Sequence, residues 1–316
     1  MQAFLNELSL PQFSSEHQAK ELLNSIAFLY RDAHSNGIRE IKVKESFFNY
    51  EFCGGYTFNS WVYDHNTDSD LRSLVLSVLN TSPYIDQIFG LYQQENGKAL
   101  EMYFEDKSCF GLGLASDLIY DTVAFSYDNG NWTSHTYPVT IKTLSVNDDG
   151  IFLEEDVKGN TRNITTKNHF DLNLSFIQEK IKDTVVNGIE LWARRNDLFS
   201  NLSFCAQVQG QLENFDSTHH DFQQILNRLF ELQNFSTSWD GVPIKPSDFK
   251  SKVTPESATR LKNFKDQLTI ACPDGEVRLF SWHARYTPGA GRIHFIPQND
   301  DKKLLIGSIA NQNTIK

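Results

Sequence analysis

The residues best suited to chemistry lie near the end of the sequence, in two short segments separated by a turn. His283 and Arg285 precede the turn 287–290, and Arg292 and His294 follow it. A four-residue loop is compatible with an antiparallel β-hairpin. The spacing then predicts that the two arginines lie opposite each other and that the two histidines do the same. All four side chains share one face, because side chains alternate across a strand.

The other face of this hairpin is predicted to be apolar and to pack on the core. Its members are Trp282, Ala284, Tyr286, Ile293 and Phe295. A slip of one residue in the register would move every side chain to the opposite face, so the prediction depends on this pairing.

The polar face has the chemistry of an anion site. Like charges directly opposite each other cost roughly 0.2–1 kcal/mol per pair, so two facing arginines favour an anion between them. Arginine suits bidentate contacts with phosphate, and histidine beside it can act as general acid or base. We therefore expect Arg285 and Arg292 to bind phosphate or nucleic acid, and we take His283 and His294 as catalytic candidates. Such a set needs no metal or cofactor to promote attack by a ribose 2′-hydroxyl on its phosphate.

A second interpretation of this face stays open. Carboxylates from elsewhere in the fold can pair the arginines, which gives the face a structural role. Two outer candidates for ligand contact are Tyr286 and Arg194. Arg194 belongs to a predicted helix, and there the simpler interpretation is a basic helix end placed favourably against the dipole.

The end of the sequence resembles a known family. The residues that carry the resemblance are Arg285-Tyr286-Thr287-Pro288-Gly289-Ala290-Gly291-Arg292-Ile293-His294-Phe295, followed by Leu304 to Ile309. They resemble the closing sheet of RelE/ParE-type bacterial toxins, over about 35 of 316 residues. Those toxins are small, basic ribosome-dependent ribonucleases or gyrase poisons, whereas this chain is long and acidic. The resemblance implies a bacterial toxin-like or defence-associated protein.

Two further motifs have simpler interpretations. Residues 111–115, Gly-Leu-Gly-Leu-Ala, lack the third glycine and the lysine of a nucleotide-binding loop, so they predict a tight turn. His219 and His220 begin a helix for which Thr218 or Asp221 is the expected cap.

Hydrophobic periodicity predicts the elements that position these residues. Helices are expected at 16–35, 170–185, 189–199 and 219–233. Strands are expected at 38–52 and 56–63, and a closing three-stranded meander at 276–286, 291–297 and 303–309. Thr254 and Pro255 predict the start of a helix that carries Glu256 and Arg260 at i,i+4 spacing.

Charge and composition predict an α+β protein with two domains. Residues 1–188 hold 14 Lys+Arg and 26 Asp+Glu, a net charge of −12, whereas residues 189–316 hold 15 and 14, a net of +1. We expect a mixed helix and antiparallel-sheet domain at 1–188. The domain at 189–316 is expected to be helical and to close with the meander. Because an acidic surface repels phosphates, nucleic-acid contact is expected only in the second domain.

The remaining features predict a cytoplasmic protein. No apolar run approaches the ~20 residues that span a bilayer, and no secretory signal is visible. The four cysteines are scattered, which indicates reduced thiols rather than a zinc or disulfide framework.

Two functional hypotheses follow from these patterns. The first is a defence-associated or toxin-like protein that binds nucleic acid or another phosphate-bearing ligand, in its sharpest form a metal-independent ribonuclease. The second is a non-catalytic subunit of a larger anti-phage assembly, which docks a protein partner through its acidic N-terminal domain. Neither hypothesis involves a membrane.

Overall fold

The computed structural model describes residues 1–80, 82–96, 99–146, 152–216, 220–286 and 291–311. The chain has an α+β fold, as its sequence predicts. It divides into two compact units, Met1–Lys180 (unit 1) and Ile181–Lys316 (unit 2). The division falls inside helix α6 (Lys167–Asp183), before the change in charge at residue 188. Within the described ranges no helix is long and apolar enough to cross a membrane.

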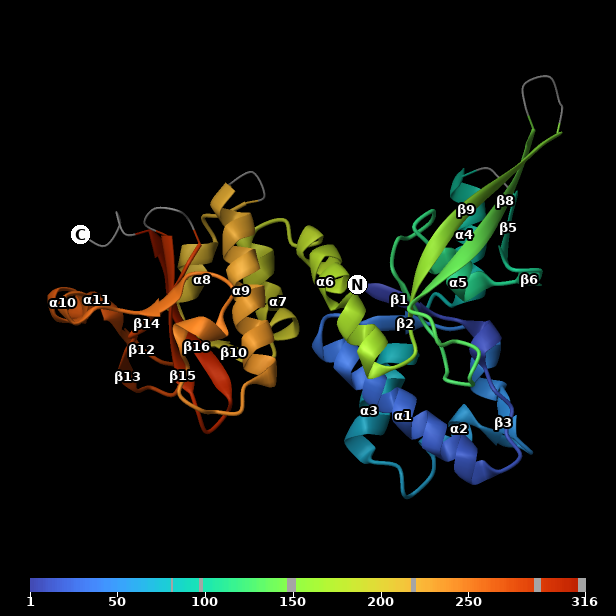
Figure 1. Ribbon diagram of the computed structural model, residues 1–316, viewed down its shortest axis with the longest axis horizontal. Helices are drawn as coiled ribbons and strands as arrows, with labels where there is room; N and C mark the ends of the chain where they lie inside the picture. Colours follow the sequence, from blue (N-terminus) through green and yellow to red (C-terminus); the bar gives the residue numbers. More distant parts are fainter. Residues whose placement is uncertain (81, 97–98, 147–151, 217–219, 287–290, 312–316) are drawn as a thin grey trace. The chain divides into compact units, whose positions relative to one another are not determined.

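Unit 1 is built on a seven-stranded mixed sheet in the order β2-β1-β7-β9-β8-β5-β6 (Figure 1). Four neighbouring strands are parallel: β2 (Glu40–Lys42), β1 (Gln2–Leu5), β7 (Val123–Phe125) and β9 (Phe152–Ile164). The others pair antiparallel: β8 (Thr136–Val146), β5 (Ala99–Phe104) and β6 (Lys107–Ser108). The parallel half departs from the expected antiparallel sheet. Parallel neighbours need a long crossover, which leaves no local hairpin signal in the sequence.

The helices of unit 1 follow the predicted periodicity in part. They are α1 (Glu16–Ser35), α2 (Phe58–Val62), α3 (Ser69–Leu79), α4 (Ile85–Asn96), α5 (Phe110–Ala115) and α6. The predicted helix at 16–35 is confirmed, and the Gln18 N–H donates to the Ser15 hydroxyl that caps it, at 3.4 Å.

Two predicted strands of unit 1 are wrong in part. The segment 38–52 contains β2, the 3-10 helix η2 (Glu45–Asn49) and the start of β3 (Glu51–Cys53). The segment 56–63 starts as β4 (Tyr56–Thr57) and then becomes α2. Thr57 and Ser60 form a capping box there, which starts a helix where alternation alone predicts a strand.

Unit 2 is built on a five-stranded sheet in the order β10-β16-β15-β14-β11. Its strands are β10 (Leu202–Phe204), β16 (Lys303–Asn311), β15 (Gly291–Gln298), β14 (Trp282–Arg285) and β11 (Val253–Pro255). The closing meander is confirmed as β14-β15-β16.

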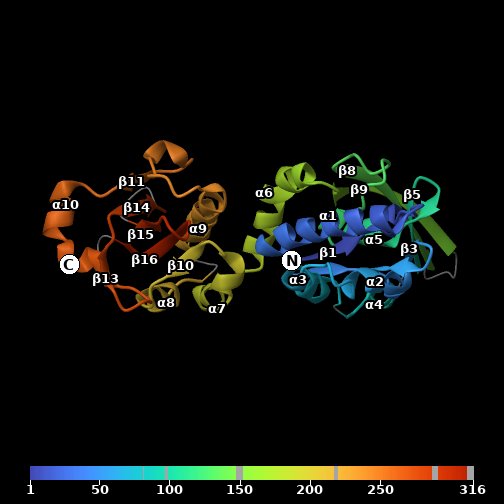
Figure 2. The same ribbon diagram turned by 90° about the horizontal axis from the view of Figure 1, so that it is seen from below.

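Helices and a small hairpin lie on the two sides of this sheet. Helix α9 (His220–Ser238) lies on one side, and α10 (Ala258–Asn263) and α11 (Lys265–Leu268) lie on the other, together with the β12–β13 hairpin (Figures 1 and 2). The hairpin comprises β12 (Thr269–Ala271) and β13 (Val277–Leu279), and α7 (Gly188–Leu198) packs on α8 (Gln207–Leu212). The site described below lies on the α10 side of the sheet.

The predicted strand at 276–286 is two strands with a break at Phe280. β13 pairs with β12 in a sheet of its own, whereas β14 belongs to the five-stranded sheet. The Phe280 N–H donates to the Leu268 carbonyl at 2.8 Å, and its ring is buried over Gly307, where a Cβ would lie 2.4 Å from a ring carbon. This tight packing holds the chain in the bend between the two sheets.

Candidate anion-binding site

The predicted hairpin register is confirmed. Arg285 pairs with Arg292 and His283 pairs with His294 across β14 and β15. On the other face, Ala284, Ile293 and Phe295 are fully buried, as the alternation predicts. The predicted turn at 287–290 lies outside the described residues.

The polar face is buried as well. Glu256, which also contacts Arg260, lies over the two histidines, and the β12–β13 hairpin packs farther along the same face. His283 is 4% exposed, Arg292 is 6% exposed and His294 is 0% exposed. Arg285 is half-buried. Buried charges of this kind need partners, so the groups that face them decide what the site can do.

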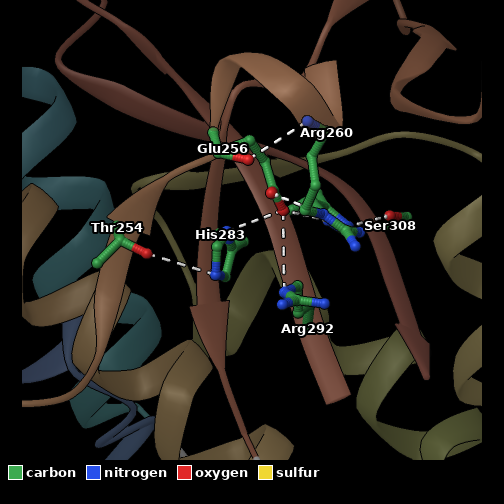
Figure 3. Close-up of polar contacts among 8 residues, drawn as sticks. Thr254, Glu256, Arg260, His283, Arg292 and Ser308 are labelled. Atoms are coloured by element: carbon green, nitrogen blue, oxygen red, sulfur yellow. Dashed lines mark hydrogen bonds and ion pairs between the residues drawn. The ribbon is translucent and has the colours of Figure 1, made fainter. Parts of the chain in front are cut away.

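Glu256 is the carboxylate at the centre of the cluster (Figure 3). Its Oε1 lies 2.9 Å from His283 Nδ1, 3.3 Å from His294 Nε2 and 3.8 Å from Arg292 Nε. The contact with His283 is at ion-pair distance but lacks hydrogen-bond geometry. The Glu256 Oε2 accepts a hydrogen bond from Arg260 Nε at 2.9 Å. One carboxylate thus contacts both histidines and two of the arginines.

The backbone around Glu256 explains its position. β11 pairs antiparallel with β14, so that Thr254 lies opposite His283 and its hydroxyl is 3.4 Å from His283 Nε2. Ser257, not Thr254, is the N-cap of α10 and accepts from the Arg260 N–H at 3.3 Å. Glu256 therefore lies between a strand and a helix, where its N–H donates to Ser281 O at 2.7 Å.

The sequence therefore identified the right pair but gave it the wrong role. Glu256 and Arg260 are in contact at i,i+4 spacing, yet Glu256 precedes the helix and its side chain is only 1% exposed. The signal that would have found it is Ser257 as a second candidate cap, which moves Glu256 onto the strand side.

Burial and neighbouring charges set the protonation states here. Burial raises the pKa of Glu256, but His283, His294 and Arg260 outweigh this effect and hold the pKa well below its usual range. Burial lowers the pKa of His294, and the contact with Glu256 offsets only part of this effect. Burial also lowers the pKa of Arg292, as do the charges of Arg260 and Arg285. At neutral pH Glu256 is ionised and His294 is neutral.

Several buried donors in the cluster lack a partner. Within the described part of the chain, Arg292 Nε and Nη1 and Arg285 Nε are enclosed by protein and make no hydrogen bond. Arg260 and Arg292 contact the Glu256 carboxylate, and the charge of Arg285 lies close enough to Arg292 to lower the pKa of that group. Among the described residues, the cluster thus holds three guanidinium groups and one carboxylate. Positive charge therefore exceeds negative charge by two before either histidine is counted. The cluster has both the spare donors and the spare charge of an anion site.

The two outer candidates do not join this cluster. Tyr286 is 3% exposed on the opposite, apolar face, and a Cβ on Gly291 would lie 2.4 Å from its ring. Burial raises the pKa of Tyr286 to about 12. Arg194 lies on α7, where it pairs with Glu190 at 2.7 Å and donates to Thr184 O at 3.2 Å. Both side chains serve local packing or pairing.

The remaining motifs have structural explanations. The N–H groups of Phe110 and Gly111 donate to the Glu7 carboxylate at 2.6 and 2.9 Å, and a Cβ on Gly111 would lie 1.9 Å from Leu5 O. The glycine-rich segment packs closely on its neighbours, as predicted, but it forms the short helix α5 and not a tight turn. Of the two expected caps of α9, Thr218 lies outside the described residues, and Asp221 lies in the first turn of the helix. The four cysteines are free, and all except Cys53 are buried.

Comparison with known proteins adds no relative. No family model matches the chain, and no curated protein or solved structure matches it significantly. The functional inferences below therefore rest on the geometry of the cluster.

Proposed function

We propose that unit 2 binds a phosphate-bearing ligand through Arg285 and Arg292, with His283 beside them. The observation that carries this proposal is the set of enclosed guanidinium nitrogens that have no hydrogen-bond partner among the described residues. A buried donor left unpaired costs ~1–3 kcal/mol, and more when it is charged. A phosphate supplies the missing acceptors and the missing negative charge, and its oxygens match the guanidinium fork.

A metal-independent ribonuclease is the sharper form of this proposal. The resemblance of residues 285–295 to RelE/ParE-type toxins supports it. His294 is fully buried, and its ring nitrogens contact Ser308 Oγ at 3.0 Å and Glu256 at 3.3 Å, so it is suited to hold the carboxylate in place. His283 is then the candidate for general acid or base. The ribonuclease form predicts RNA cleavage in EDTA that is lost in His283→Ala, and cleavage unaffected by this change would refute it.

A second candidate function is that of a non-catalytic subunit of a larger bacterial defence assembly. The acidic N-terminal part, with a net charge of −12 over residues 1–188, supports it as the surface that docks a protein partner. This candidate places the protein in the cytoplasm and predicts salt-sensitive ligand binding without turnover.

Ligand-dependent stabilisation tests the binding proposal directly. A ligand at 100 times its Kd raises the stability of the folded state by about 2.7 kcal/mol. We expect phosphate-bearing ligands to raise the Tm of the wild-type chain and to have little effect on Arg285→Gln.

Arg195→Gln is the matched control, because Arg195 stacks on Trp192 at 3.9 Å and lies outside the cluster. It is expected to keep the full shift in Tm. A shift that persists in Arg285→Gln, or no shift with any phosphate-bearing compound, would contradict the proposal.

A further inference from the structure

The excess positive charge of the cluster and the burial of its arginines together indicate which kind of phosphate it binds. We infer that the site is built for a terminal phosphomonoester, a dianion, and not for an internal phosphodiester of a nucleic-acid backbone. This inference rests on the proposed function and specifies its ligand.

The first step is charge. Among the described residues, the cluster holds the guanidinium groups of Arg260, Arg285 and Arg292 and the one carboxylate of Glu256, which leaves two positive charges in excess. A phosphomonoester carries about −1.5 to −2 at pH 7, since its second pKa is near ~6. A backbone phosphodiester carries a single negative charge. The monoester neutralises the surplus, whereas the diester leaves a buried positive charge uncompensated, which is costly in a poorly solvated site.

The second step is depth. The Arg292 side chain is only 7% exposed, and its Nε and Nη1 are enclosed by protein. Arg285 is half-buried and is the more accessible of the two facing arginines, so a ligand reaches the cluster from its side. A terminal phosphate offers three free oxygens at the end of a chain and can enter such a site. An internal phosphodiester has a sugar on each side and only two free oxygens, so it meets surface arginines rather than deeply buried ones.

The third step is the role of Glu256. Because its pKa is held well below the usual range, the carboxylate stays ionised and keeps Arg260 and His283 oriented when no ligand is bound. Its contact with Arg292 is through Nε at 3.8 Å, and Arg292 Nη1 has no acceptor among the described residues. Glu256 thus fixes one edge of the cluster and leaves the other edge for the ligand.

Two matched pairs of probes test this inference on the full chain by titration calorimetry. The small pair is methyl phosphate, a dianion, and dimethyl phosphate, a monoanion. The large pair is one short single-stranded oligoribonucleotide with a 5′-phosphate and the same oligonucleotide with a 5′-hydroxyl. In each pair, we expect the compound with the terminal monoester to bind at least about tenfold more tightly than its partner, which corresponds to 1.4 kcal/mol. Its binding should weaken as the pH falls from 7 to 5, because the phosphate takes up a proton.

The variants separate the charge of Arg285 from its shape. Arg285→Gln should abolish the preference for the monoester. Arg285→Lys should keep part of it, because lysine keeps the charge and loses the planar fork. Arg195→Gln should behave as the wild type.

The outcomes distinguish the two levels of the proposal. If the 5′-hydroxyl oligonucleotide binds as tightly as the 5′-phosphate form and both depend on Arg285, the monoester inference is wrong and the phosphate site stands. If no probe binds in an Arg285-dependent way, the phosphate site itself is refuted. Tighter binding of the 5′-phosphate oligonucleotide than of methyl phosphate identifies a nucleic-acid end as the source of the monoester. Binding of methyl phosphate alone identifies a small phosphorylated metabolite.

Discussion

The two units each contain a buried polar network on a sheet, and the networks differ in one respect that bears on function. In unit 1, Asn6 Nδ2 donates to Ser126 Oγ at 2.9 Å, and Ser126 Oγ donates to Asn163 Oδ1 at 2.7 Å. The amide of Asn163 then donates to Thr165 Oγ1 at 2.9 Å, and that hydroxyl donates to Trp132 O at 2.9 Å. Each of these links has a donor and an acceptor from the chain itself.

The cluster of unit 2 is charged and incomplete. Its one carboxylate contacts two histidines and two arginines, and the enclosed nitrogens of Arg285 and Arg292 have no hydrogen-bond partner among the described residues. The unit 1 network lies at the carboxyl ends of β1, β7 and β9, the usual place for ligands in parallel sheets, yet its partners are all internal. Position in the fold is therefore a weaker guide to function here than the balance of donors, acceptors and charge.

Removing the carboxylate of the unit 2 cluster should have the largest effect. Glu256→Gln leaves buried arginines without their counterion, and breaking a buried ion pair in this way typically costs 3–5 kcal/mol, so we expect a loss of about that size in unit 2. Hydrogen exchange read by mass spectrometry measures it, because it reports the two units separately.

The control for Glu256→Gln is Asp274→Asn. Asp274 pairs with Arg278 at 2.6 Å, but its side chain is 48% exposed, so this change should leave exchange in unit 2 nearly unaltered. Equal effects of the two changes would mean that burial of the Glu256 cluster carries no special cost.

A neutral network should respond less strongly. Asn163→Ala in unit 1 leaves Ser126 and Thr165 without one partner each, and we expect a loss of about 1–3 kcal/mol. The loss should appear as faster exchange in unit 1 alone. A loss as large as that of Glu256→Gln would remove the contrast between the neutral and the charged network.

The sequence was sufficient to predict the pairing of the hairpin strands, because that pairing depends only on residues close together in the chain. Strand alternation and a four-residue loop determine the pairing of Arg285 with Arg292, and the structure has that register. It was insufficient for Glu256, whose role depends on β11 pairing with β14 and on which of two possible caps, Thr254 or Ser257, begins α10.

Local patterns also miss how exposed a face is. Alternation shows that His283 and His294 share a side of the hairpin, but it does not reveal that Glu256 covers that side. For the same reason the parallel pairing of β1 with β7, more than 100 residues apart in the chain, leaves no trace in local periodicity. Tertiary contacts determine both features.

Acid should destabilise unit 2 in two steps. The folded-state pKa of His294 lies below its ordinary 6.5, so the unfolded chain binds the proton more readily, and stability falls as the pH drops below about 6.5. The pKa of Glu256 is also lowered, so the stability that it contributes above 4.5 is lost as the pH falls further. One proton corresponds to a slope of at most about 1.4 kcal/mol per pH unit.

Urea unfolding across pH 2 to 8 checks this prediction. His294→Asn should remove the step near 6.5 and keep the lower one. The Asn6–Ser126–Asn163–Thr165 network contains no titratable group, so it should add no step of its own. A stability of unit 2 that does not change between pH 5 and 7 would contradict the burial of a neutral His294.

The smallest change in stability should come from replacing Arg292, one of the two arginines of the proposed site. Arg292→Met keeps much of the side-chain volume and removes a buried cation whose Nε and Nη1 have no hydrogen-bond partner in the described chain. Glu256 keeps His283, His294 and Arg260. Replacing poorly paired buried charge with an apolar side chain is often neutral or stabilising, so we expect a change between zero and a gain of about 1 kcal/mol without ligand.

The same variant should lose the Tm shift that phosphate-bearing ligands give the wild type. A residue whose removal leaves the free protein as stable while abolishing ligand binding is retained for function at some expense of stability. If Arg292→Met instead loses about 2 kcal/mol or more, Arg292 is the structural counterion of Glu256. The unit 2 cluster would then be, like the unit 1 network, a device for holding strands together.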